Sequence, residues 1–168
     1  MKTKKILCTL MAVMCIGTAA LTGCGSDSDS STANSANSAA AAQTNESVDV
    51  TAVADKLKDG IEFKDELAEL DEAKIEKIIG ISADSYTKAK VYVSSSGGTA
   101  EEIDCFEAKD AEAIADTLTA RVESQKKVFE NYVPEEMTKL NDPVLVTNGN
   151  YVYLCLSNDN DKAKEIIG

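Results

Sequence analysis

Histidine is absent from this chain of 168 residues. Its absence removes the most common general base of enzymes, the serine–histidine relay and most catalytic zinc sites. An enzyme with this sequence would have to work with carboxylates and hydroxyls alone. We therefore expect a non-catalytic protein that needs no metal and no cofactor.

Basic residues are also scarce. The chain has 17 Lys and Arg against 29 Asp and Glu, a formal net charge of −12, and Arg121 is its single arginine. A chain this acidic is repelled by nucleic acid and by anionic lipid head groups, so we expect neither as a partner. A basic partner, a cation or plain solubility remains as the reason for the charge.

No apolar run reaches the roughly 20 residues that a membrane-spanning helix needs. Residues 6–20 form a run of about 15 residues, and Lys2, Lys4 and Lys5 precede it. A basic start followed by an apolar run of this length is typical of a secretory signal peptide.

The apolar run ends in Leu21-Thr22-Gly23-Cys24. This segment resembles the lipobox of bacterial lipoproteins, in which the cysteine takes a diacylglyceryl thioether before the signal is cut at the preceding glycine. The resemblance implies cleavage between Gly23 and Cys24, and a lipid anchor on Cys24 at the extracytoplasmic face of the cell membrane. An ordinary cleaved signal with a chance cysteine, or an uncleaved anchor, is the alternative.

Residues 24–47 consist mainly of Ser, Ala, Asn, Thr, Asp and Gln. Such a segment cannot bury enough apolar surface to offset the entropy of ordering, which predicts a disordered tether. We divide the chain into a signal peptide over 1–23, this tether over 24–47 and one folded domain over 48–168. Loss of residues 1–23 removes three lysines and no acid, and brings the net charge to about −15.

Two of the five cysteines, Cys8 and Cys15, lie in the signal peptide, and Cys24 is the predicted lipid site. Cys105 and Cys155 remain, each in an apolar, strand-like context. They form a disulfide if their strands are adjacent, because an oxidising compartment permits it. We favour two buried free thiols, since neither cysteine has a CxxC or metal-ligand spacing.

The hydrophobic pattern of residues 48–168 predicts helices and strands in the order ααββαββα. The helices are expected at 49–60, 71–80, 110–132 and after Asp159, and the strands at 86–93, 102–108, 144–147 and 150–157. Two antiparallel hairpins, the second turning at Asn148-Gly149, would form a four-stranded sheet with the long helix laid across one face. The predicted fold class is therefore α+β.

Two of these elements have a clear apolar face. In the first strand Ala89, Val91 and Val93 alternate with a polar side that includes Tyr92, which predicts a half-buried strand. The apolar face of the second helix is formed by Ile75, Ile78 and Ile79.

Several short segments in the second half of the chain carry a resemblance to a known family. They are residues 100–103, Phe106, 108–110, Arg121 with Gln125, 129–136, 149–152 and 161–163. With the lipobox and the polar tether, these motifs resemble a family of uncharacterised lipoproteins from Gram-positive bacteria, catalogued as domain of unknown function 4358. The resemblance extends over about residues 48–168 and departs at Cys105 and Cys155, where plain apolar residues are expected. It implies an extracytoplasmic compartment and the fold, but no chemistry.

Four polar segments are candidates for chemistry. The paired acids at 101–102 and 135–136 offer acid/base groups, but in so acidic a chain we expect them on solvated faces. Residues 157–161 resemble an oxygen-rich calcium loop, yet Lys162 and Lys164 interrupt the pattern and a helix cap is favoured. Residues 94–98 offer backbone amides to an anion, but lack the P-loop lysine and favour a hairpin tip.

Arg121 borders the apolar stripe of the long helix beside Gln125, and no acid lies within one helical turn of it. It is either a clamp for a ligand carboxylate or phosphate, or half of an internal ion pair with an acid from the sheet or a loop. We favour the ion pair. Three tyrosines offer either an aromatic surface or ordinary packing, and they are Tyr132, Tyr151 and Tyr153.

Taken together, the sequence predicts a lipid-anchored extracytoplasmic module that binds an unknown protein or small molecule. A carboxylate-dependent cell-envelope enzyme and a small-ligand receptor component are the alternatives. The chain is short for a two-lobed receptor, which places that alternative last. The oligomeric state is left open.

Overall fold

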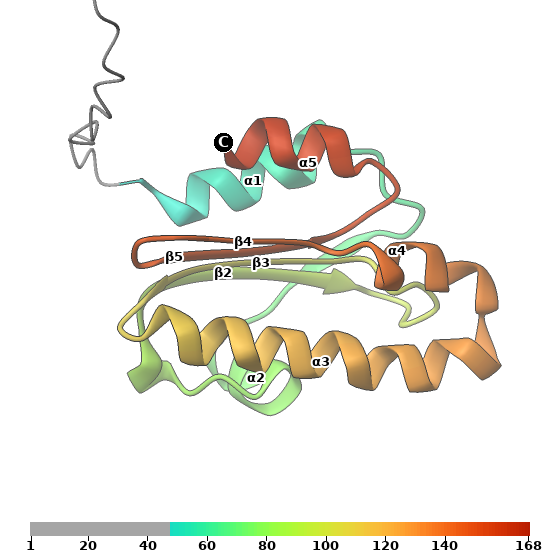
Figure 1. Ribbon diagram of the computed structural model, residues 1–168, viewed down its shortest axis with the longest axis horizontal. Coiled ribbons are helices and arrows are strands. Elements are labelled where there is room, and N and C mark those ends of the chain that lie inside the picture. Colours follow the sequence, from blue (N-terminus) through green and yellow to red (C-terminus); the bar gives the residue numbers. More distant parts are fainter. Residues whose placement is uncertain (1–47) are drawn as a thin grey trace, which may run out of the picture. The chain divides into compact units, whose positions relative to one another are not determined.

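The computed structural model describes residues 48–168. The predicted signal peptide, the lipobox with Cys24 and the tether up to residue 47 therefore lie outside the described residues. Within them, one antiparallel sheet lies between two layers of helices (Figure 1). The predicted α+β class is confirmed.

The sheet has five strands in the order β1-β2-β3-β5-β4. Their bounds are β1 Leu67–Glu69, β2 Tyr86–Ser94, β3 Glu102–Ala108, β4 Val144–Asn148 and β5 Tyr151–Leu156. The predicted count of four strands is wrong, because β1 adds to the free edge of β2 with Ala68 opposite Val93. At three residues β1 is too short for an alternating pattern to show in the sequence.

The helical segments are α1 Val50–Gly60, α2 Glu72–Lys74, η1 Ile75–Ile79, η2 Ala83–Ser85, α3 Ala111–Tyr132, η3 Pro134–Glu136, α4 Met137–Asn141 and α5 Asn160–Ile167. Figure 1 shows α1 and α5 on one face of the sheet, and α3 with α2 on the other. Four helices begin at an aspartate whose carboxylate accepts a backbone N–H of the first turn, and these caps are Asp49, Asp71, Asp110 and Asp159. No helix within residues 48–168 is long and apolar enough to cross a membrane.

The sheet buries both of its faces. The core under α3 includes Val91, Phe106, Leu118, Val122 and Val152. The core under α1 and α5 includes Val50, Leu57, Tyr92, Ile103 and Tyr153. The prediction that β2 is half-buried holds at Lys88, whose side chain is 48% exposed, but is wrong at Tyr92, which α1 covers and leaves 4% exposed.

The second predicted helix is α-helical only over α2. The next five residues, η1, form a π-helix that ends at Gly80 with a positive φ of 87°. The wider turn changes which side chains face the core. Ile75 and Ile79 are buried, whereas Ile78 is 42% exposed, so its predicted place on the apolar face is wrong.

The second hairpin is present, but its turn is one residue later than predicted. Asn148 pairs with Tyr151, which leaves Gly149 and Asn150 as the two turn residues. Gly149 has a positive φ of 60°, which a hairpin turn requires at its first central position. Asn148 is therefore the last residue of β4, and not part of the turn.

Candidate functional site

Arg121 of α3 reaches across to Glu102, the first residue of β3. Its Nε donates to Glu102 Oε1 at 2.5 Å and its Nη2 donates to Oε2 at 2.6 Å. Its Nη1 donates to the carbonyl of Ile78 at 2.7 Å, which ties η1 to the same group. The side chain of Glu102 is 2% exposed and that of Arg121 is 17% exposed, so this ion pair is largely shielded from water.

Gln125 lies one helical turn after Arg121 and joins the pair. Its Nε2 donates to Glu102 Oε2 at 3.0 Å. Its Oε1 is buried and has no hydrogen-bond partner among the described residues. The two residues that the sequence placed beside the apolar stripe therefore converge on one carboxylate.

Asp104 lies two residues after Glu102 and so on the same face of β3. It is 0% exposed, and neither carboxyl oxygen has a hydrogen-bond partner among the described residues. Burial, and then the neighbouring Glu102, raise the pKa of Asp104 well above its usual range, while Arg121 opposes the shift. Burial therefore favours the protonated, uncharged form of Asp104.

Burial by itself lowers the pKa of Arg121, but its hydrogen bonds to Glu102 and the charge of Glu102 outweigh burial, so the pKa of Arg121 is raised. Arg121 and Glu102 form an ion pair beside Asp104. The floor of the site is electrically balanced.

An open groove of about 410 Å³ lies over this ion pair. We call it the Arg121 groove; its walls include Ile78, Ser95, Thr99, Arg121, Gln125 and Phe129. A second hollow, of about 370 Å³, continues from it between η1 and α3 and reaches Val128. Ile78, Arg121 and Gln125 line both, so the charged pair lies at their junction.

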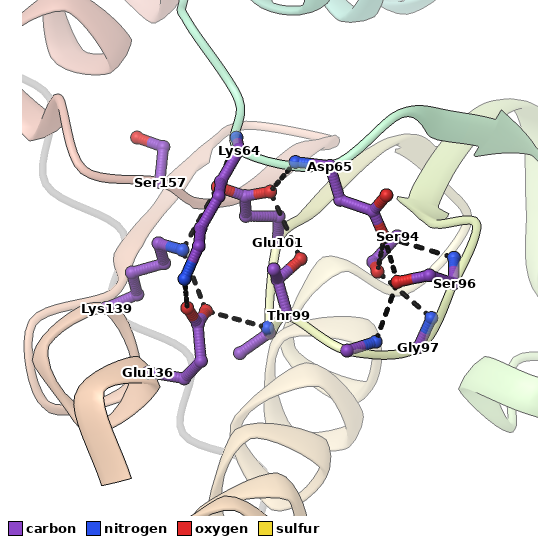
Figure 2. A network of polar contacts seen from close by, with 12 residues as sticks. Lys64, Asp65, Ser94, Ser96, Gly97, Thr99, Glu101, Glu136, Lys139 and Ser157 are labelled. Carbon is purple, nitrogen blue, oxygen red and sulfur yellow. Dashed lines mark hydrogen bonds and ion pairs between the residues drawn. The ribbon is translucent and has the colours of Figure 1, made fainter. Parts of the chain in front are cut away.

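The loop between β2 and β3 forms one wall of the groove and is held by Asp65. The hydroxyls of Ser94 and Ser96 each donate to Asp65 Oδ2 at 2.5 Å, and the amide of Ser96 donates to the same atom at 3.0 Å (Figure 2). These bonds, first those of the two hydroxyls, lower the pKa of Asp65 to about 2.

The amides of this loop are already engaged. Those of Gly97 and Gly98 donate to Ser94 Oγ and Ser96 Oγ, and that of Ser95 donates to the carbonyl of Glu66. The segment is a hairpin tip, and its amides from Ser95 to Gly98 are directed at acceptors of the same chain. The alternative interpretation, an anion cradle, has no free amide in this stretch.

A second buried cluster lies where β3 begins, next to α4. Lys139 Nζ is 3.0 Å from Glu101 Oε1 and 2.7 Å from Glu136 Oε2, and the side chains of all three are at most 3% exposed (Figure 2). The amides of Lys64 and Asp65 donate to the two oxygens of Glu101, both at 2.9 Å.

Burial alone raises the pKa of Glu101, but these amides and Lys139 outweigh it, so its pKa is lowered. Glu101 is therefore ionised inside the protein. The cluster fixes α4 and the segment before β1 against the start of β3.

The expectation that the paired acids lie on solvated faces is wrong for three of the four. Glu101 and Glu102 are each 1% exposed and Glu136 is 2% exposed, while Glu135 lies at the surface. A buried acid is tolerated only with a cation or several donors, and Lys139 and Arg121 supply these from distant parts of the chain. One feature of the sequence could have indicated buried acids in this strand, because Asp104 lies between Ile103 and Cys105 in an apolar segment.

The structure does not bring the three candidate tyrosines together. Tyr153 is 3% exposed in the core under α1 and α5, and Tyr151 packs against the same core. Tyr132 is 73% exposed at the end of α3, which covers the opposite face. They do not form one aromatic surface.

The remaining candidate segments have structural partners. Asp159 caps α5 by accepting from the amide of Lys162 at 3.0 Å. Cys105 and Cys155 are buried free thiols, and each lies diagonally across β3 and β5 from the other, since Cys105 faces Tyr153 and Cys155 faces Ile103. Burial raises the pKa of Cys155 to about 12. Within residues 48–168, no group of three or more Cys, Asp or Glu side chains is arranged to hold a metal ion.

Comparison with known proteins gives one match. No curated protein and no solved structure matches this chain. Residues 59–157, from the end of α1 to the residue after β5, match the sequence pattern of a protein family, and they include both buried ion-pair clusters. Because this match covers more than half of the chain, the protein belongs to the family described as Domain of unknown function (DUF4358).

Proposed function

We propose that this protein is a lipoprotein anchored through Cys24 at the extracytoplasmic face of the cell membrane, and that residues 48–168 bind a partner protein. The lipobox at 21–24, the basic and apolar segments before it and the polar segment after it support the anchor. One or two acyl chains contribute about 0.8 kcal/mol per buried methylene, so the anchor needs no help from the protein surface.

The Arg121 groove is the observation on which the binding role rests. Arg121 donates three of its five N–H groups to Glu102 and Ile78. Its side chain remains 17% exposed at the junction of the two hollows. The two remaining N–H groups are available to an acceptor from outside the chain.

The chemistry of the groove favours a peptide segment as the ligand. Glu102 already balances the charge of Arg121, so the free N–H groups suit an uncharged carbonyl better than an anion. Ile78 and Val128 border the site and are 42% and 59% exposed, so both side chains can contact an apolar residue of a ligand. A backbone carbonyl next to an apolar side chain meets both requirements.

A carboxylate-dependent enzyme is the second candidate, because Glu102 lies beside Asp104, whose pKa burial raises, and two such carboxyls resemble an acid/base pair. A catalytic carboxyl must lie within hydrogen-bond reach of the substrate. Asp104 is 0% exposed and Glu102 is 1% exposed, so α3 would have to move before either could react. We therefore rank binding first.

Photo-crosslinking in intact cells tests the binding role. A photoreactive residue at Val128, which lines the second hollow, is expected to capture one specific protein. The matched control is the same residue at Ala52, an exposed position of α1 on the opposite face of the sheet. Capture at Val128 alone supports the proposal, whereas no capture at Val128, or equal capture at both positions, contradicts it.

A further inference from the structure

β4 lies at one edge of the sheet, and some of its backbone N–H and C=O groups have no hydrogen-bond partner among the described residues. The carbonyl of Asn150 accepts from the amide of Ala108, so Asn150, Val152 and Leu154 direct their backbone groups toward β3. Tyr151, Tyr153 and Cys155 then direct theirs toward β4, where their partners are Asn148, Val146 and Val144. The N–H and C=O groups of Leu145 and Thr147 consequently point away from the sheet.

We propose that a second copy of this chain pairs with β4, strand against strand, and joins the two sheets into one. In antiparallel pairing with Val146 opposite Val146 of the other copy, Leu145 of each copy faces Thr147 of the other. All four outward N–H groups then meet all four outward C=O groups across the two-fold axis. The strand is thus complementary to itself, as a symmetric interface requires.

Charge distinguishes this edge from the opposite one. Residues 143–158 contain no charged side chain in a chain that is 27% charged. In the proposed register Asp142 faces Asn150 of the other copy, so no like charges oppose each other. Five acids lie in or next to β1, and charged residues at an edge strand are a common protection against pairing between copies; these acids are Asp65, Glu66, Glu69, Asp71 and Glu72.

The side chains of β4 suit a contact with a second strand. Leu145 and Val146 are partly buried, and Thr147 and Asn148 are exposed. Two strands of this length bury less than the ~1,200 Å² typical of stable interfaces, so the pairing is weak and reversible. Confinement on a membrane, which rests on the proposed lipid anchor, would raise the effective concentration and favour it.

A single engineered cysteine tests the pairing in intact cells that express the full chain. Val146→Cys places two thiols opposite each other in a non-hydrogen-bonded pair, where the Cα atoms lie at about 4.5 Å, within disulfide range. We expect a disulfide-linked dimer on mild oxidation, at least about tenfold more abundant than for Ala68→Cys in the centre of the β1 edge. The unsubstituted chain is the background, so the result does not depend on the state of Cys24.

Adding Thr147→Pro should abolish the dimer. It removes an outward N–H and leaves the bonds between β4 and β5 intact, since that amide does not point toward β5. The proposal is overturned by no dimer with Val146→Cys, by an equal yield at Ala68→Cys, or by a crosslink to a protein of another mass.

Should Val146→Cys fail to fold, hydrogen exchange on the unsubstituted chain tests the pairing instead. The amides of Leu145 and Thr147 must then slow with increasing concentration, and unchanged rates overturn the proposal.

Discussion

Asp104 is a carboxyl group in a place where water cannot reach it. It is 0% exposed between the apolar residues of β3 and the helix α3, beside the ion pair of Glu102 and Arg121. An ionised carboxylate without partners is strongly disfavoured in such a place, so the folded protein keeps the proton. This proton couples folding to pH.

Asp104→Asn should remove that coupling. The unfolded chain loses the Asp104 proton near its ordinary pKa of 3.8, whereas burial raises the pKa of Asp104 in the folded chain, which releases the proton only at higher pH. Stability is therefore lost as the pH rises from about 4 toward the raised pKa, by up to about 1.4 kcal/mol per pH unit. Asparagine has no proton to lose at this position, so the free energy of unfolding of the variant should increase relative to that of the wild type as the pH rises.

Urea unfolding of both chains at several values between about pH 4 and about pH 8 measures this difference. Other titrating groups are common to the two chains and cancel. A difference in the free energy of unfolding that stays constant over this range would show that Asp104 is not a buried neutral acid.

Arg121→Ala should destabilise the fold by about 3–5 kcal/mol, because it leaves the buried carboxylate of Glu102 without its cation. The control is Lys126→Ala on the same helix. Its partner Glu123 is 59% exposed, so the loss should stay within about 0.5 kcal/mol. Adding Glu102→Gln to Arg121→Ala should recover part of the loss, and denaturant unfolding of all four chains measures it. Equal effects of Arg121→Ala and Lys126→Ala would contradict the assignment.

At the scale of elements, local rules predicted most of the fold. The period of α3 and the two hairpins are properties of short segments, and the structure contains them, with the turn of the second hairpin one residue later than predicted. The predictions fail where a segment distant in the sequence determines the local structure. β1 exists because β2 offers a free edge, and η1 is wider than an α-helix in a segment that Arg121 binds through the carbonyl of Ile78.

The short helix α4 is held to the sheet by charge. Lys139→Met should cost about 3–5 kcal/mol, since Glu101 and Glu136 would remain buried without the ammonium group between them. Lys64→Met is the matched control, because the Lys64 side chain is 60% exposed and lies 3.9 Å from Glu136, and its loss should stay within about 1 kcal/mol. Thermal unfolding compares the two variants. Similar melting temperatures would mean that the cluster does not stabilise the fold.

At the scale of the whole molecule, the sequence predicted the class and the family but not the site. The α+β class follows from periodicity, and the family match covers residues 59–157. The Arg121 groove unites η1, the loop after β2, the start of β3 and the middle of α3. Arg121 and Gln125 were recognisable from their place on α3, whereas Glu102 could be identified as their partner only from the folded chain.

The negative charge of the whole chain bears on the proposed lipid anchor. The chain carries a formal net charge of −12, and the buried acids Glu102, Glu101 and Glu136 each pair with Arg121 or Lys139 inside the fold. A surface this acidic is repelled by anionic head groups, which is why the proposed attachment to the membrane is assigned to Cys24 and not to the folded domain.

Mass spectrometry of the protein purified from membranes tests this central claim most directly. The account predicts a mature chain that begins at Cys24 and carries a diacylglyceryl group on the sulfur, and Cys24→Ala should abolish that mass and leave an uncleaved or released chain. A native N-terminal peptide with an unmodified Cys24, or one that still begins at Met1, would contradict it.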